Sequence, residues 1–357
     1  MGGTTMYPRI TISLPKLIHN AQTLLQQCQE NHITSCFLVG KVMAGNIQVL
    51  SPLATLGFSY LADSRIQNIK DFQDILLPKA LMRIPMISEV KDVVTYSNLA
   101  LVSELATIQA LHDEAKRQGK VYEIIFLFDL GDLREGIFYT SPYLQIIAKV
   151  LTLPNIHLKG IGTNLTCFGG VIPDEKNMGQ LIAIKHEIES VFQISLEIIS
   201  GGNSSALYMI NSLPKEVNNL RIGEALFLGR ETAYGKSLTG FYQDAFMLEV
   251  EVVEVQEKPS YPIGTITQNS FGEVPQFEDS KTMRRAILAI GKQDVDYHHL
   301  IPMNLNIKLL ASSSDHLIVQ VVKGCCQVGD IIPFRLNYAS LLQCMSSRYV
   351  EKKINQE

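Results

Sequence analysis

The first two thirds of the chain alternate between short apolar runs and amphipathic segments, and this alternation constrains the fold more than any other feature. Runs rich in Leu, Ile, Val and Phe are typical of strands buried on both faces. We predict eight such strands, at residues 36–41, 58–62, 80–84, 99–102, 123–129, 156–162, 196–199 and 226–228. Amphipathic helices are predicted between them, for example at 104–118, 143–151 and 178–192.

Strands and helices that alternate in this way predict an α/β fold with a parallel (β/α)8 barrel, the TIM barrel. The rival is an open doubly wound sheet. Its G-x-G-x-x-G fingerprint, expected directly after the first strand, is missing from the sequence. We therefore expect the closed barrel.

Residues 236–357 show a different pattern, which predicts a C-terminal all-β domain. A long alternating run at 246–255 predicts the first strand. Shorter strands are predicted at 285–290, 307–310, 317–322 and 331–336, and a final helix at 339–345. A chain of 357 residues is long enough for two domains with separate cores. We predict a barrel domain at 1–235 and a β domain at 236–357, and residues 7–13 belong to the first or pair with the second.

Composition excludes several classes of function. The net charge is -4 with 18% charged residues and no basic stripe, so neither nucleic acid nor an anionic membrane is an expected partner. The start of the chain lacks the charged and apolar regions of a signal peptide, and no apolar run reaches the length of a membrane span, so we expect a cytoplasmic protein. The six cysteines lack metal-ligand spacing, which predicts reduced thiols and no metal site.

Polar and charged residues follow almost every predicted strand. They gather where the carboxyl ends of the strands would form one rim of a barrel, which is where such barrels place their chemistry. They include Lys41, Asp63, Arg83, Glu104, Asp129, Asn164 and the run 200–205. A lysine seen alone is more often an exposed surface residue. At the end of a buried strand, however, Lys41 is a candidate for a Schiff base with a carbonyl cofactor.

The segment Ser200-Gly201-Gly202-Asn203-Ser204-Ser205 is the best candidate for a phosphate-binding loop. Glycines allow backbone N–H groups to approach an anion, and the serines open a predicted helix. Alone, such a segment is as often an ordinary helix cap. Arg221-Ile222-Gly223 adds a second backbone donor just before the last predicted strand. A reactive lysine together with a phosphate site suggests pyridoxal 5'-phosphate (PLP).

The sequence resembles the alanine racemase-like enzymes of the third PLP fold type over nearly its whole length. Three segments resemble family motifs. Residues 40–45 resemble the lysine motif K-A-N-A-Y-G, residues 129–136 resemble D-T-G-M-x-R-x-G, and residues 220–225 resemble V-R-P-G-I-A. Further segments are similar to the ornithine racemase branch, at 61–65, 83–86, 162–167, 229–235 and 289–296. Several long segments in the same order are far more specific than one motif.

The resemblance implies roles for individual residues. Lys41 would form the imine with the cofactor and move the α-proton on one face of the substrate. Arg134 would bind the substrate carboxylate. The remaining cofactor contacts would come from Asn164, Asn203, Ser204, Arg221 and the backbone at Ile222 and Gly223.

Arg221 would face the pyridine nitrogen of the cofactor. A guanidinium donates hydrogen bonds without giving up a proton, so that nitrogen would stay unprotonated and withdraw electrons weakly. Weak withdrawal suits racemisation and limits decarboxylation, and the related decarboxylases are expected to carry a glutamate at this position.

The sequence departs from the family at three places. A lysine, Lys292, replaces the tyrosine that acts as base on the opposite face and comes from the partner subunit. Lys292 would serve if positive charge and burial lowered its pKa; Cys167 is the rival base, and an ordinary surface lysine is nearly as plausible. Gly45 replaces a phosphate-binding tyrosine, for which Tyr349 is a possible substitute, and Asn164 replaces the histidine under the ring.

We therefore predict a homodimeric, PLP-dependent racemase with shared active sites that interconverts the L- and D-forms of a basic amino acid, ornithine being favoured, by two-base proton transfer. The alternatives are a lysine, alanine or broad-specificity racemase, or a non-catalytic PLP homeostasis protein, which would not need residues 236–357. The terminal ammonium of the substrate requires a carboxylate, and spacing does not select among Glu231, Asp294, Asp132 and Glu135. We place Asp294 with Arg134 among the predicted substrate-binding residues.

Overall fold

The structure is a computed structural model that describes residues 6–269, 271–274, 276, 282–304 and 306–356. It contains two compact units: Lys16–Gln243, and Asp244–Glu357 together with the N-terminal segment Met1–Pro15. The domain boundary that we predict after residue 235 stays a prediction, because a compact unit need not fold independently. In the described ranges, no helix combines the length and apolar character that a membrane crossing requires.

The unit formed by residues 16–243, which is described without a gap, is a closed barrel of eight parallel strands. The order is β5-β4-β3-β2-β10-β9-β8-β6, and β5 pairs with β6 to close the barrel. The strands are β2 (Ser35–Val39), β3 (Tyr60–Asp63), β4 (Lys79–Leu81), β5 (Leu99–Val102), β6 (Tyr122–Asp129), β8 (Ile156–Thr163), β9 (Ile198–Ser200) and β10 (Asn219–Ile222). The predicted (β/α)8 barrel is confirmed. A two-residue strand, β7 (Ile137–Phe138), pairs parallel with the last two residues of β6.

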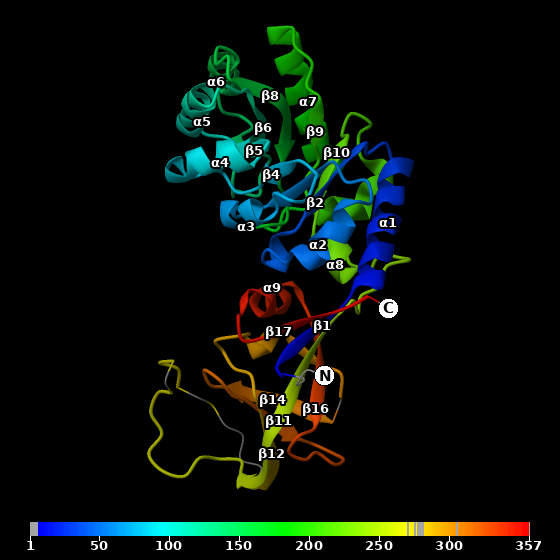
Figure 1. Ribbon diagram of the computed structural model, residues 1–357, viewed down its shortest axis with the longest axis vertical. Coiled ribbons are helices and arrows are strands. Elements are labelled where there is room, and N and C mark those ends of the chain that lie inside the picture. Colours follow the sequence, from blue (N-terminus) through cyan, green and yellow to red (C-terminus); the bar gives the residue numbers. More distant parts are fainter. Residues whose placement is uncertain (1–5, 270, 275, 277–281, 305, 357) are drawn as a thin grey trace. The chain divides into compact units, whose positions relative to one another are not determined.

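Helices surround the barrel strands on the outside (Figure 1). They are α1 (Leu14–Glu30), α2 (Ile47–Ala54), α3 (Ile66–Asp71), α4 (Val90–Tyr96), α5 (Leu105–Arg117), α6 (Tyr143–Leu151), α7 (Glu175–Phe192) and α8 (Glu224–Leu228). The predicted helix at 143–151 coincides with α6. Helix α7 begins three residues before its predicted start because Asp174 caps it: the Asp174 carboxylate accepts a hydrogen bond from the Asn177 backbone N–H at 2.7 Å.

The predicted eighth strand at 226–228 is wrong. Those residues lie in α8, and the eighth strand is β10, so Arg221 and Ile222 are inside a strand rather than before one. The prediction failed because the strand contains polar residues and the apolar run belongs to a helix. Asn219 and Arg221 are polar yet 0% and 1% exposed, whereas the apolar run at 226–228 forms one turn of a buried helix. A short apolar run does not by itself distinguish a strand from a buried helix.

Close packing inside the barrel depends on two glycines of β8. A Cβ atom at Gly160 would lie 1.9 Å from the carbonyl oxygen of Ile198, and one at Gly162 would lie 2.8 Å from the Cβ of Ser200. Strand β9 can therefore approach β8 only because both positions lack a side chain. Apolar residues from β2 to β6 and β9, including Phe37 and Val39, fill the interior below this level.

The second unit is built on an antiparallel sheet, as predicted for an all-β domain. Its strands are β1 (Arg9–Ser13), β11 (Phe246–Pro259), β12 (Thr282–Leu288), β13 (Leu300–Pro302), β14 (Ile307–Ser312), β15 (Leu317–Val321), β16 (Ile331–Leu336) and β17 (Glu351–Asn355), with helix α9 (Tyr338–Ser346). Strand β1 pairs antiparallel with β11 and parallel with β17. We did not predict β13 or β17; the sequence of β17, Glu-Lys-Lys-Ile-Asn, has too few apolar residues to show a strand pattern.

Candidate active site

Lys41 lies at the carboxyl end of β2, where the strand passes into a short 3-10 helix at Lys41–Met43. Phe37 and Val39 belong to the apolar barrel interior, and side chains two residues apart share one face of a strand. Lys41 follows the end of β2 by two residues, at the carboxyl end of the barrel strands, and it is exposed. The turn that follows is tight: Ala44 has φ 49° and Gly45 has φ 83°. Lys41 therefore lies where a lysine that binds a cofactor at the barrel mouth has to be.

A buried acid, Asp63, lies near Lys41 at the end of β3. One carboxylate oxygen accepts hydrogen bonds from the Arg65 backbone N–H at 2.8 Å and from the Asn68 side chain at 3.1 Å. Burial raises the pKa of Asp63 to about 6, against the opposing effects of these hydrogen bonds and of the Lys41 charge. The Asn68 side chain also lies beside Gly45, where a Cβ atom would be 3.3 Å from its oxygen. Asn68 therefore occupies space next to the position at which the family carries a tyrosine.

A chain of polar side chains connects the neighbouring strands β2, β10 and β9 and ends at Arg221. The Asn219 side chain donates to the Ser35 hydroxyl at 2.9 Å, and the Ser200 hydroxyl donates to Asn219. Arg221 Nη1 donates to Ser200, and Arg221 Nη2 donates to the Thr163 carbonyl oxygen at 2.7 Å. Burial lowers the pKa of Arg221 to about 10, so the guanidinium stays charged at neutral pH.

The Nε of Arg221 is buried and has no hydrogen-bond partner among the residues that the structure describes. A buried donor without an acceptor is costly, so this site fits a ligand that presents an acceptor atom there, such as the nitrogen of a pyridine ring. Arg221 lies opposite Phe37 in the β2–β10 pair, which places it on the strand next to the one that leads to Lys41. Lys41 and Arg221 are therefore placed by neighbouring strands of the barrel.

The loop after β9 has the features of a phosphate site. Asn203 caps the 3-10 helix Ser204–Ser212, and its side-chain oxygen accepts from the Ser205 backbone N–H at 2.8 Å. The Ser204 hydroxyl accepts from the Ala225 backbone N–H at 3.1 Å, which joins this loop to the first turn of α8. The Ser205 hydroxyl oxygen is buried without a partner in the described chain. Gly223 packs tightly, because a Cβ atom there would lie 3.0 Å from the Val39 carbonyl oxygen and would require a small shift of that strand. These residues fit PLP.

A second polar group lies on the rim between β6 and the β9 loop. Arg134 and Glu135 form an ion pair through two hydrogen bonds, from Nε to Oε2 and from Nη2 to Oε1. Asn164 donates to Glu135 at 3.1 Å and accepts from Asn203 at 2.9 Å. The sulfur of Cys167 lies 3.3 and 3.4 Å from the side-chain nitrogens of Asn164 and Asn203. The predicted substrate-binding arginine is thus connected to the predicted phosphate loop.

Two of the four carboxylates considered for a substrate ammonium are occupied by backbone amides. Asp132 is 0% exposed and accepts three hydrogen bonds, from the backbone N–H groups of Cys167, Phe168 and Val171. Glu231 is 2% exposed and accepts from the backbone N–H groups of residues 233, 234 and 236. Both carboxylates hold loops in place.

Lys292 and Asp294 belong to the second unit. The Lys292 ammonium lies 3.2 Å from a carboxylate oxygen of Glu273 and 3.9 Å from the centre of the Phe271 ring, and both contacts stabilise its positive charge. Asp294 is 6% exposed and accepts a hydrogen bond from the Ser347 hydroxyl at 2.6 Å. The positive charge that we expected near Lys292 is not among the contacts that the structure shows for it.

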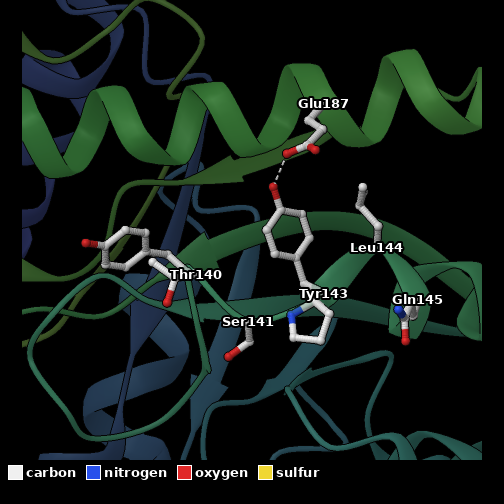
Figure 2. A pocket seen from close by; sticks show the side chains of 8 residues that line it. Thr140, Ser141, Tyr143, Leu144, Gln145 and Glu187 are labelled. Carbon is white, nitrogen blue, oxygen red and sulfur yellow. Dashed lines mark hydrogen bonds between the residues drawn. The ribbon is translucent and has the colours of Figure 1, made fainter.

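A separate pocket of about 390 Å³ lies between α6, the loop before it and α7 (Figure 2). Tyr143 points from α6 toward α7, where Glu187 accepts a hydrogen bond from its hydroxyl. Burial, reinforced by this carboxylate, raises the pKa of Tyr143. None of the predicted site residues lines this pocket, so it does not belong to the candidate active site.

The barrel unit therefore contains every predicted cofactor-binding residue, together with Arg134, on the loops and strand ends of one rim. Sequence reasoning did not single out Asn68 or Asn219, and assigned Asp63 only to the general rim. Asp63 had a detectable signal, because a carboxylate directly after a fully apolar strand has to be buried or functional. Asn219 had none, because an isolated asparagine carries no pattern.

Known proteins resemble this chain in sequence and in fold. Residues 12–231 match the family model described as the alanine racemase N-terminal domain. The ornithine racemase of Acetoanaerobium sticklandii is 45% identical over 353 residues, 98% of this chain and 100% of that protein. The lysine racemase of Thermotoga maritima is 34% identical over 354 residues, 97% of this chain and 98% of that protein. An alanine racemase from Bartonella henselae with covalently bound pyridoxal phosphate superimposes with a TM-score of 0.74 at 17% identity, over 98% of this chain and 100% of that one.

Proposed function

This chain belongs to the alanine racemase family and is a PLP-dependent amino-acid racemase, and we propose that its substrate is a basic amino acid, ornithine before lysine. The observation that carries the reaction class is the buried guanidinium of Arg221, whose Nε lacks a partner in the described chain. The choice of a basic substrate is supported by the names of the two full-length relatives, which are racemases of diamino acids.

We assign cofactor binding to the residues of the barrel rim. Bound PLP withdraws electrons from the α-carbon of the substrate and so makes the α-proton acidic. Lys41 would hold the cofactor through Nζ. The phosphate would be bound by Ser204, by the backbone at Ile222 and Gly223 and, in part, by the loop that Asn203 caps.

Arg221 sets how strongly electrons are withdrawn. Its Nε–H would donate to the ring nitrogen, and a guanidinium keeps its own proton, so the ring nitrogen remains unprotonated. Withdrawal is then sufficient for proton exchange and weak for loss of carbon dioxide. Asn164, hydrogen-bonded to both Glu135 and Asn203, would hold the cofactor ring from one side.

Lys41 and Lys292 are the two proposed bases, one on each face of the α-carbon. Lys292 would come from a second copy of the chain, and Cys167 is the rival for its role. Replacing Lys292 with alanine and measuring α-deuterium exchange from each enantiomer tests this assignment. Unchanged exchange in both directions would remove Lys292 from the mechanism, and a loss on Cys167→Ser alone would identify the cysteine.

A homodimer with shared sites follows from the same assignment, and mixing two inactive variants tests it. A dimer of one Lys41→Ala chain and one Lys292→Ala chain would keep one intact site of two. Subunit exchange at equal concentrations would then restore about a quarter of the wild-type activity, because half of the dimers are mixed. No recovery after proven exchange would contradict shared sites. We also propose that the enzyme acts in the cytoplasm, since all six cysteines are free thiols.

Substrate recognition is assigned to Arg134 for the α-carboxylate and, as a prediction, to Asp294 for the terminal ammonium. The decisive assay is incubation of the PLP-loaded enzyme with L-ornithine, L-lysine and L-alanine, followed by chiral chromatography. We expect D-ornithine to form fastest. Turnover of alanine with ornithine inert would contradict the substrate proposal, and a product lighter by carbon dioxide would contradict the reaction class.

A further inference from the structure

We propose that Glu135 makes this enzyme selective for amino acids with a second ammonium group, because the substrate carboxylate has to displace Glu135 from Arg134. The inference rests on the proposed role of Arg134 as the partner of the α-carboxylate. Glu135 and the substrate α-carboxylate compete for the same guanidinium, that of Arg134.

Glu135 occupies the binding groups of Arg134. Its two oxygens accept from Nε and Nη2 of Arg134, the paired arrangement in which a guanidinium binds any carboxylate, including that of an amino acid. The backbone holds the pair in place. Leu133 has φ 58° before it, and Gly136 has φ 118° after it, with no room for a Cβ atom, which would lie 2.5 Å from the Asp129 backbone nitrogen.

Displacement leaves Glu135 without its counter-charge in a poorly solvated position. The side chain is 19% exposed, against 40% for Arg134. The hydrogen bond from Asn164 at 3.1 Å is neutral and does not balance the charge. A carboxylate in such a position is destabilised unless another cation replaces the one it lost.

A diamino acid supplies that cation. In ornithine, three methylene groups separate the α-carbon from a terminal ammonium, which can reach a carboxylate adjacent to the arginine that holds its α-carboxylate. The substrate then exchanges one ion pair for two. A neutral amino acid of equal length breaks the Arg134–Glu135 pair and returns nothing to Glu135. Selectivity thus follows from the exchange rather than from a preformed pocket.

Two of the other carboxylates that we considered for the substrate ammonium are not available for this role. Asp132 and Glu231 are buried and saturated by backbone N–H groups. The role of Asp294, in the second unit, in binding the terminal ammonium remains a prediction. The experiment therefore includes a variant of Asp294 as the competing assignment.

The test compares L-ornithine with L-norvaline, which has the same side chain without the amine. The PLP-loaded wild type, Glu135→Gln and Asp294→Asn are titrated with each ligand by following the cofactor absorbance, and kcat/KM is measured by chiral chromatography. The control is Glu114→Gln, which breaks a bidentate pair with Arg117 on the outer surface of α5. Glu135→Asp keeps the charge, and Glu135→Met is a second neutral variant in case Glu135→Gln does not fold.

We expect the wild type to bind ornithine at least about tenfold more tightly than norvaline, and Glu135→Gln to reduce this ratio by about tenfold or more. Glu114→Gln should keep the ratio, and Glu135→Asp should keep part of it. A ratio within twofold of wild type in the neutral Glu135 variants, loss of the ratio only in Asp294→Asn, or no preference in the wild type would each overturn the inference. Failure of the proposed function is distinct: binding would favour ornithine while neither D-ornithine nor D-lysine is formed.

Discussion

Replacing Asp63 with asparagine should stabilise the enzyme at high pH and not at low pH. Asp63 is 0% exposed, and its second carboxylate oxygen has no partner in the described chain. Burial raises its pKa from 3.8 to about 6. The folded state therefore binds the proton more tightly than the unfolded state. The resulting stabilisation is complete below pH 3.8 and is lost as the pH rises through about 6.

The size of the effect follows from the pKa shift. At about 1.4 kcal/mol per pKa unit, the ionised carboxylate costs the fold about 3 kcal/mol at pH 8, of which about 2 kcal/mol develops between pH 4 and pH 8. Asparagine can accept the same two hydrogen bonds, from Arg65 and Asn68, and does not ionise. Its unpaired amide group adds a constant penalty of about 1–3 kcal/mol, which does not change with pH.

The measurement is urea unfolding followed by circular dichroism at several pH values from 4 to 8, with saturating PLP, for the wild type, Asp63→Asn and Asp74→Asn. The last variant removes an exposed carboxylate and controls for the loss of one charge. The difference in unfolding free energy between Asp63→Asn and the wild type should rise by about 2 kcal/mol across this range. A difference that is flat with pH, or that falls as pH rises, would refute the assignment of Asp63 as a buried acid.

Three further predictions follow from the rim. Gly136→Ala should lower the free energy of unfolding by more than about 3 kcal/mol and Gly131→Ala by about 1–2 kcal/mol, because both have positive φ but only the first meets backbone atoms; thermal unfolding compares them. Glu231→Gln should cost about 1–2 kcal/mol of stability and leave the KM for ornithine within twofold, and a large rise in KM would mean that Glu231 binds substrate. Arg221→Lys should weaken PLP binding by about tenfold in equilibrium dialysis, since lysine lacks the Nε donor, and unchanged affinity would show that this donor does not bind the cofactor.

The barrel was predictable because seven of its strands coincide with largely apolar runs, and the eighth was missed because polar residues interrupt its apolar run. In β10, polar Asn219 and Arg221 stand where a buried strand usually has aliphatic residues, and both belong to the hydrogen-bonded polar chain that ends at the proposed cofactor site. The apolar run at 226–228 was then mistaken for the missing strand. The strand that departs from the expected pattern thus contains Arg221, to which we assign a role in the proposed function.

The carboxylates were harder to interpret than the strands. From sequence, Asp132, Glu135 and Glu231 are equivalent, because each follows a predicted strand or lies in a family segment. Their roles depend on how the loops fold: Asp132 and Glu231 accept backbone N–H groups, and Glu135 pairs with a side chain. Which amides a carboxylate meets is decided by loop conformation, which no periodic pattern encodes.

The pairing of β1 with β11 and β17 bears on synthesis by the ribosome. Residues 9–13 emerge first, yet their parallel neighbour at 351–355 is translated only after every other strand of that sheet. The barrel segment, 16–243, is complete more than a hundred residues earlier. The nascent chain can thus close the barrel before β17, the parallel partner of β1, has been synthesised. A stop codon placed just before residue 351 would remove β17 and leave one edge of β1 unpaired. An unpaired strand edge can bind a strand of another chain, so we expect the truncated protein to aggregate.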